Sequence, residues 1–260
     1  MFEGLFGSKH IWGLSVAVVL LTGFFVLFHF LNPKLTKEKG RKYVLRTIAC
    51  VMVGLEFCKM VFILSGYGQA SGIITYGQFP FHLCSMPLVL YPLVAFGKER
   101  TSRIFAPAAF IIGIVAGSIT LIYPSNVLFG SPGNSDVSWW TDYGINFPMH
   151  SFIYHSLMVA FAGYMIQSKI YKIRAFDFVF ASGVMLSLAS VAMIMNAIIP
   201  NADYFMLGHG YGMPTQFIIE SAGLPVYIIT MLSIGIFVVF LVYSYWIIKA
   251  LIIKVNAKKS

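Results

Sequence analysis

Two residues that can do nucleophilic chemistry lie close together in the stretch FPFHLCSMPLVLYP, residues 79–92. His82 and Cys84 stand at the beginning of an apolar run. A cysteine thiolate is a strong nucleophile, and a histidine can activate the thiol by accepting its proton. In a helix, however, positions i and i+2 point to nearly opposite sides, so His82 is poorly placed to activate Cys84. The base is therefore expected from another segment of the chain.

His155 is the best candidate for that base. Ser151 lies one helical turn before it and shares its helix face. His150 is separated from His155 by about 140° around a helix, so the two histidines should not share a role. We expect the sulfur of Cys84 and a ring nitrogen of His155 to lie at about hydrogen-bond length, with His150 nearer the membrane surface.

Further polar side chains complete the candidate site. They are His82, Ser85, Ser151, Asn196 and Asp203. His82 or Asn196 would stabilise an oxyanion, and the others would bind the oxyanion or the substrate. The remaining cysteines, Cys50 and Cys58, are interpreted as small apolar residues of a helix.

The composition predicts that membrane-spanning helices position these residues. The chain has 260 residues, of which 58% are hydrophobic and only 10% are charged, whereas a soluble domain averages about a quarter charged residues. Runs of about 20 apolar residues match a hydrocarbon core of about 30 Å, and lipid forces such runs to be helical. Seven runs can be drawn, at about 11–31, 45–66, 79–96, 104–123, 148–167, 176–199 and 224–249. The sequence therefore predicts an all-α polytopic membrane protein, with seven transmembrane helices in one domain spanning residues 1–260.

The distribution of basic residues predicts the topology. Lysine and arginine gather at about 34–46, 98–103, 169–174 and 249–259, whereas the loops at about 67–78, 124–147 and 200–223 contain none. This positive-inside pattern predicts an outside N-terminus and a cytoplasmic C-terminus in the cell membrane. The net charge of +9 is thus a topology signal, and it gives no reason to expect a nucleic-acid partner.

The polar residues of three predicted spans fall at one depth. At about 1.5 Å per helical residue, Cys84, His155 and Asn196 would each lie about 6–10 Å below the outer surface. Ionisable residues inside a membrane are costly and are functional candidates for that reason. We expect these residues to form one pocket that opens to the outer leaflet.

The sequence also resembles a known family. The motif His82-Leu83-Cys84-Ser85, together with His155, Asn196 and the stretch NADYFML at 201–207, is similar to YwaF-type bacterial integral membrane proteins. The similarity runs from about residue 45 to 245. YwaF-type proteins resemble the transmembrane protein 164 family, which is described as cysteine-dependent acyltransferases that remodel phospholipids. The resemblance implies an acyl-cysteine intermediate on Cys84 and a histidine base.

These observations favour a phospholipid acyltransferase or transacylase, with phospholipids or lysophospholipids as substrates. The route through a thioester needs no cofactor. One alternative is a zinc hydrolase, for which the available ligands are His82, His150, His155, Asp203, His209 and Glu220. A second alternative is a seven-helix transporter or sensor whose polar residues line a ligand cavity.

Overall fold

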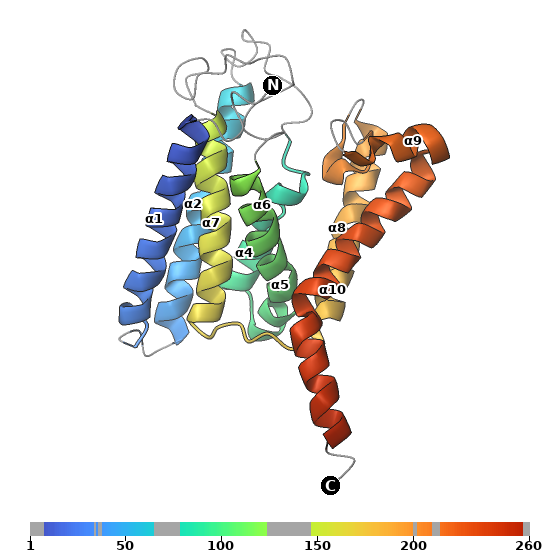
Figure 1. Cartoon of the computed structure of the whole chain (residues 1–260). Coiled ribbons are helices and arrows are strands. Elements are labelled where there is room, and N and C mark those ends of the chain that lie inside the picture. The colour runs from blue at the N-terminus through green and yellow to red at the C-terminus, as the bar shows by residue number, and fades with distance from the viewer. Residues whose placement is uncertain are drawn as a thin grey trace.

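The structure, a computed structural model, describes residues 8–33, 35, 38–64, 79–123, 147–199, 202–209 and 214–256. All regular secondary structure in this part of the chain is helical, which confirms the predicted all-α class (Figure 1). Four of the described helices are long and apolar enough to cross a membrane. They are His10–Leu31, Glu99–Ile122, Asp177–Ile198 and Leu224–Asn256. The chain is therefore a membrane protein with several apolar helices.

Two further helices coincide with predicted spans and carry the polar residues of interest. Helix α2 (Glu38–Leu64) bears a Glu-Lys pair in its second half, and α7 (Phe147–Gln167) bears the two central histidines. Helix α1 (Ser8–Leu31) packs against α7, and α2 contacts α7 as well. Helix α7 is thereby held between neighbours, and Ser151, Tyr154 and His155 on it are buried.

The third predicted span begins later than expected. The sequence suggested a helix from Phe79, but residues 79–82 are not helical, and His82 has an extended backbone (φ −72°, ψ 157°). A short 3₁₀ turn, η2 (Leu83–Ser85), leads into α4 (Pro87–Phe96). Proline suits the first turn of a helix because its missing N–H has no partner there anyway. Cys84 thus lies in a turn before the helix, and the helical geometry expected for His82 and Cys84 is wrong.

The fourth predicted span is a continuous helix with an irregular middle. Helix α5 (Glu99–Ile111) passes into the π-helical segment η3 (Ile112–Ala116) and then into α6 (Gly117–Ile122). At Gly113 a Cβ would lie only 2.6 Å from the Cβ of Ala162 and 2.8 Å from the carbonyl oxygen of Met158. The absence of a side chain at Gly113 therefore lets η3 approach α7 closely.

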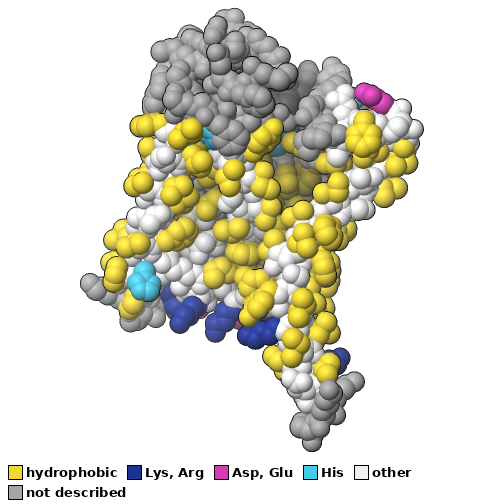
Figure 2. Space-filling view, viewed as in Figure 1, with side chains coloured by type: hydrophobic (Ala, Val, Ile, Leu, Met, Phe, Trp, Pro, Cys, Tyr) yellow, Lys and Arg dark blue, Asp and Glu magenta, His cyan; other side chains and the backbone are white. Residues whose placement is uncertain are grey.

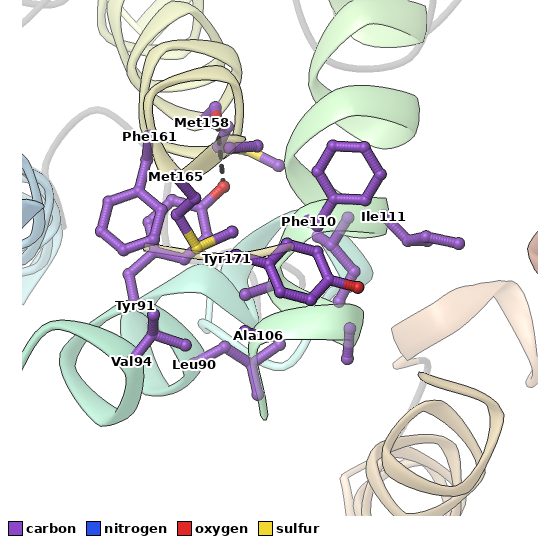
Figure 3. Close-up of a cluster of buried hydrophobic side chains, with 14 of the residues drawn as sticks. Leu90, Tyr91, Val94, Ala106, Phe110, Ile111, Met158, Phe161, Met165 and Tyr171 are labelled. Carbon is purple, nitrogen blue, oxygen red and sulfur yellow. Dashed lines mark hydrogen bonds between the residues drawn. The ribbon is translucent and has the colours of Figure 1, made fainter. Parts of the chain in front are cut away.

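The hydrophobic core lies between α2, α4, α5 and α7. Tyr91 stacks on Phe161 with ring centroids 3.7 Å apart, and its hydroxyl donates to the carbonyl oxygen of Met158 at 3.0 Å (Figure 3). Burial of such large side chains fixes α4 against α7. The turn that carries Cys84 is attached directly to α4, so this packing also limits where Cys84 can lie.

Helices α8 (Asp177–Ile198) and α10 (Leu224–Asn256) pack against each other, and α9 (Phe217–Ala222) precedes α10. Figure 1 shows the pair leaning away from the other helices towards the end that carries α9. Near the opposite end, Tyr243 donates to the carbonyl oxygen of Pro107 at 3.1 Å, and its hydroxyl lies 3.0 Å from that of Tyr171. Tyr171 also donates to Asp177 at 2.8 Å. These buried contacts join the pair to α5.

Candidate functional site

His155 occupies a buried position on α7 and is held in one orientation. Its side chain is 3% exposed. Nδ1 lies 2.7 Å from the carbonyl oxygen of Ser151 and 3.2 Å from the Ser151 hydroxyl oxygen. A carbonyl oxygen can only accept, so Nδ1 carries the hydrogen and donates it, which leaves Nε2 as the acceptor of the neutral ring. The expected pairing of Ser151 with His155 one turn later is present.

The Nε2 atom of His155 is buried and has no hydrogen-bond partner among the described residues. Buried polar groups in native proteins nearly always have a hydrogen-bond partner, so a group without one needs an explanation. A nitrogen with a free lone pair in a dry environment has the state that a general base needs before it accepts a proton.

Cys84 lies beside a residue that the sequence did not single out. Its sulfur is 3.9 Å from the hydroxyl oxygen of Thr120 on α6, and Thr120 is itself buried. One turn earlier on α6, a Cβ on Gly117 would come within 3.2 Å of the carbonyl oxygen of His155. Helix α6 therefore links the two candidate catalytic residues, because it contacts Cys84 through Thr120 and packs on α7 beside His155.

Cys84 and His155 make no direct hydrogen bond in the described structure, in which the polar neighbour of the thiol is Thr120. Catalytic hydrogen bonds are often long without substrate and tighten only when it binds. His155 is buried, so its side chain faces the protein interior.

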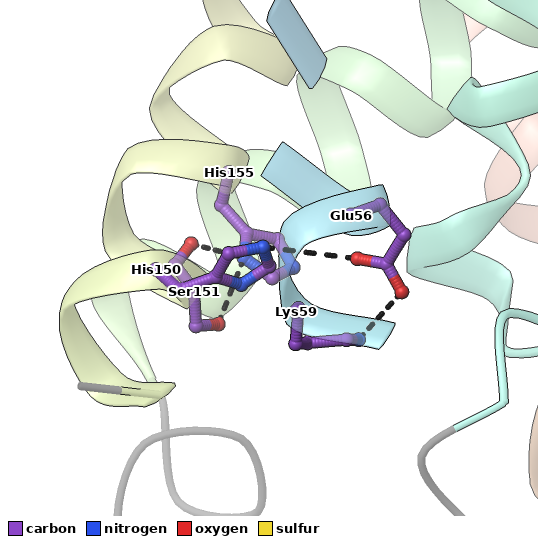
Figure 4. A network of polar contacts seen from close by, with 5 residues as sticks. All are labelled: Glu56, Lys59, His150, Ser151 and His155. Carbon is purple, nitrogen blue, oxygen red and sulfur yellow. Dashed lines mark hydrogen bonds and ion pairs between the residues drawn. The ribbon is translucent and has the colours of Figure 1, made fainter. Parts of the chain in front are cut away.

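A network of charged groups borders His155 on the side of α2 (Figure 4). Glu56 and Lys59 form an ion pair with 2.5 Å between oxygen and nitrogen, and Nε2 of His150 lies 3.8 Å from the second Glu56 oxygen. All three side chains are largely buried. Glu56 and Lys59 lie about one turn apart on the same helix. His150, which was predicted to lie nearer the membrane surface than His155, faces Glu56 on α2.

Tyr154, also on α7, completes this part of the structure. Its ring lies parallel to the ring of His150, with centroids 5.9 Å apart, and edge-on to that of His155 at 5.8 Å. The side chain is 4% exposed, and its hydroxyl has no hydrogen-bond partner in the described parts of the chain. Tyr154 was not among the predicted site residues, since a tyrosine in an apolar helix is an ordinary core residue by type.

The other predicted site residues gather around a different residue, Tyr204. The amide of Asn196 accepts from the Tyr204 N–H at 2.7 Å and donates to its carbonyl oxygen at 3.0 Å. The ring of His82 lies edge-on to the Tyr204 ring at 5.1 Å. The Asp203 carboxylate accepts hydrogen bonds from the backbone N–H groups of Gly208 at 2.7 Å and His209 at 3.1 Å. These residues hold the segment after α8 in place.

Ser85 closes the η2 turn, because its backbone N–H donates to the carbonyl oxygen of His82 at 2.9 Å. The seven predicted residues are thus divided. Cys84 and Ser85 lie in the turn beside α6, Ser151 and His155 lie on α7, and His82, Asn196 and Asp203 surround Tyr204. Asn201, which belongs to the motif at 201–207, lies outside the described residues.

The six ligands considered for zinc do not converge. Among the described residues, no three His, Cys, Asp or Glu side chains are grouped as a metal ion would require. His209 and Glu220 are exposed, whereas His155 is buried on α7. The geometry of these residues therefore gives no support to a zinc hydrolase.

Comparison with known proteins supplies the family. Neither the curated proteins nor the solved structures contain a match to this chain. Residues 5–243, nearly the whole length, match the TMEM164 family. The relation to YwaF-type proteins stays a prediction. The match includes the turn with Cys84 and the helix with His155, and the chain belongs to the TMEM164 family.

Proposed function

We propose that the protein is a membrane-embedded phospholipid acyltransferase or transacylase in which Cys84 is the nucleophile and His155 is the general base. The observation that carries the proposal is the Nε2 atom of His155, which is buried, fixed in its acceptor state by Ser151, and unpaired among the described residues. Membership of the TMEM164 family fits this activity.

The chemistry is an exchange of esters through a thioester. Nε2 of His155 accepts the proton of the Cys84 thiol, and the sulfur attacks the carbonyl carbon of a phospholipid ester. A carbon–sulfur bond forms while the carbonyl electrons move onto the oxygen, which becomes an oxyanion. When the C=O bond re-forms, the bond to the glycerol oxygen breaks, and that oxygen takes the proton from His155. The products are an acyl-Cys84 thioester and a lysophospholipid.

The second half of the reaction repeats these steps in reverse. A hydroxyl group of an acceptor such as a lysophospholipid gives its proton to His155 and attacks the thioester carbon. The carbon–sulfur bond breaks, and the Cys84 sulfur recovers its proton. No cofactor takes part, because every proton and electron pair is supplied by the thiol, the imidazole and the two substrates.

The test of this function is direct detection of the thioester. Wild-type protein in detergent micelles, incubated with a phospholipid that carries a labelled acyl chain, should retain the label on the peptide that contains Cys84. Neutral hydroxylamine should release that label, since it cleaves thioesters. Cys50→Ala and Cys58→Ala are matched controls, because both cysteines are exposed on α2, and both variants should be labelled as wild type is. Label on another peptide, or none at all, would contradict the proposed nucleophile.

The topology that belongs to this function has seven spans in the cell membrane, with the N-terminus outside. The basic residues support it, since exposed lysine and arginine side chains gather at the end of the helices opposite α9 (Figure 2). Cys84 and His155 would then act on lipids of the outer leaflet, where ester carbonyls lie just below the headgroups.

A reporter that works only outside the cytoplasm tests this topology. Fused after residue 260 it should be silent, and fused within the segment 124–146 it should be active. An active reporter at the C-terminus would reverse the orientation and place Cys84 in the cytoplasmic leaflet.

A further inference from the structure

Within the described residues, Tyr154 differs from five other buried tyrosines in the state of its hydroxyl group. Five tyrosine hydroxyls donate to acceptors within the described residues, namely those of Tyr91, Tyr164, Tyr171, Tyr227 and Tyr243. The Tyr154 hydroxyl has no hydrogen-bond partner in the same parts of the chain, although its side chain is only 4% exposed. Burying a hydroxyl without a partner lowers stability, so folding alone gives no reason for a tyrosine here.

Tyr154 lies close to the residues of the proposed reaction. Its ring is held against His150 and edge-on to His155. Helix α6 packs on α7 beside His155, and its Thr120 hydroxyl is 3.9 Å from the Cys84 sulfur. The unused donor thus lies in the same part of the protein as the proposed nucleophile and beside the proposed base.

The proposed reaction needs a donor of this kind. Attack by sulfur places a negative charge on the former carbonyl oxygen, and a fixed O–H or N–H group must stabilise that charge in a dry site. The residues expected to do so are engaged elsewhere, because both ends of the Asn196 amide bind the Tyr204 backbone and the His82 ring packs on the Tyr204 ring. The Thr120 hydroxyl is engaged as well, because its polar neighbour is the Cys84 sulfur at 3.9 Å.

We propose that the Tyr154 hydroxyl is a catalytic residue that donates a hydrogen bond to the oxyanion formed when Cys84 attacks the ester. This inference rests on the proposed function. The phenol keeps its proton throughout, and the hydrogen bond forms as the carbonyl oxygen gains charge and is released when the C=O bond re-forms. The oxyanion also gives the buried hydroxyl the acceptor that it lacks among the described residues of the free protein. The hydrogen bond therefore stabilises the transition state relative to the free enzyme.

Tyr154→Phe tests the inference, because it removes only the hydroxyl group. Two reactions of Cys84 should separate. Acylation by a labelled phospholipid passes through an oxyanion and should slow by about 10²–10³-fold, as for the loss of one oxyanion donor. Alkylation by iodoacetamide uses the same sulfur but forms no oxyanion, so its rate should match that of wild type. Tyr164→Phe is the control on the same helix, since that hydroxyl donates to Asn32, and both of its rates should be unchanged.

Each outcome has one meaning. If wild type forms no acyl-Cys84, the proposed function fails before Tyr154 is tested. If wild type is acylated and Tyr154→Phe is acylated as fast, the oxyanion role is wrong and the function stands. Equal loss of acylation and alkylation would make Tyr154 a residue that positions the thiol, and would also overturn the inference. The melting temperature of Tyr154→Phe should be no lower than that of wild type, and a variant that fails to fold would show that the hydroxyl is paired.

Discussion

Replacement of His155 by alanine should slow acyl-Cys84 formation by about 10²–10⁴-fold, the range that a positioned general acid or base contributes. The Nδ1 atom of this histidine is fixed by the Ser151 carbonyl oxygen at 2.7 Å, and Nε2 is left as the acceptor. Alanine removes that acceptor, and no other histidine among the described residues occupies the same position. The rate should be measured with the labelled phospholipid assay at saturating substrate.

His150→Ala is the matched control for this variant. His150 lies on the same helix and is also largely buried, but it faces Glu56 at 3.8 Å. The variant should keep most of the wild-type rate, because Glu56 retains its ion pair with Lys59. A His155→Ala protein that forms the thioester at nearly the wild-type rate would exclude His155 as the base, and a large loss in His150→Ala alone would transfer the role to His150.

The second large effect concerns stability. Glu56→Ala should lower the free energy of unfolding by about 3–5 kcal/mol, because it leaves the ammonium group of Lys59 buried without its counter-ion. The Lys59 side chain is 12% exposed and that of Glu56 is 8% exposed. Removal of both charges in Glu56→Leu/Lys59→Leu should restore most of the loss, since an apolar pair costs no desolvation. Reversible unfolding in mixed detergent micelles measures both values.

The ion pair of Glu38 and Lys42 provides the comparison on the same helix. Their nitrogen and oxygen lie 2.9 Å apart, but the Glu38 side chain is 66% exposed. Glu38→Ala should therefore cost no more than about 1 kcal/mol. Similar losses in Glu38→Ala and Glu56→Ala would show that Lys59 is solvated, and a double variant as unstable as Glu56→Ala would show that packing and not charge determines the effect.

Apolar runs located the helices well because lipid allows few alternatives to a helix of about 20 residues. The third run shows the limit of this reasoning. Hydropathy treats residues 79–96 as one segment, whereas α4 begins at Pro87 after an extended His82. The backbone before Pro87 depends on turn geometry and tertiary contacts, to which a hydropathy pattern is insensitive.

The candidate site was predicted from depth, and depth leaves the direction of each side chain open. Asn196 and His155 were expected to share a pocket, yet Asn196 turns towards the backbone of Tyr204 and His155 towards Ser151. The pairing of Ser151 with His155 could be predicted because both lie on one helix, four residues apart. The role of Tyr154 could not be predicted in this way. Its distinguishing property is a hydroxyl group without a hydrogen-bond partner in the described structure, and that property depends on the three-dimensional packing.

The π-helical segment Ile112–Ala116 has a consequence for how the activity can be lost. A π-helical segment contains one residue more than the α-helix it replaces, and its wider turn absorbs that residue. Substitutions that convert the segment to a regular α-helix without removing a residue would turn Thr120 and the rest of α6 by about 100° relative to α5. Thr120 would then no longer face Cys84, although every residue of the proposed site would still be present in the sequence. A descendant of this protein with such substitutions would carry the full set of catalytic residues without the arrangement that makes them act together.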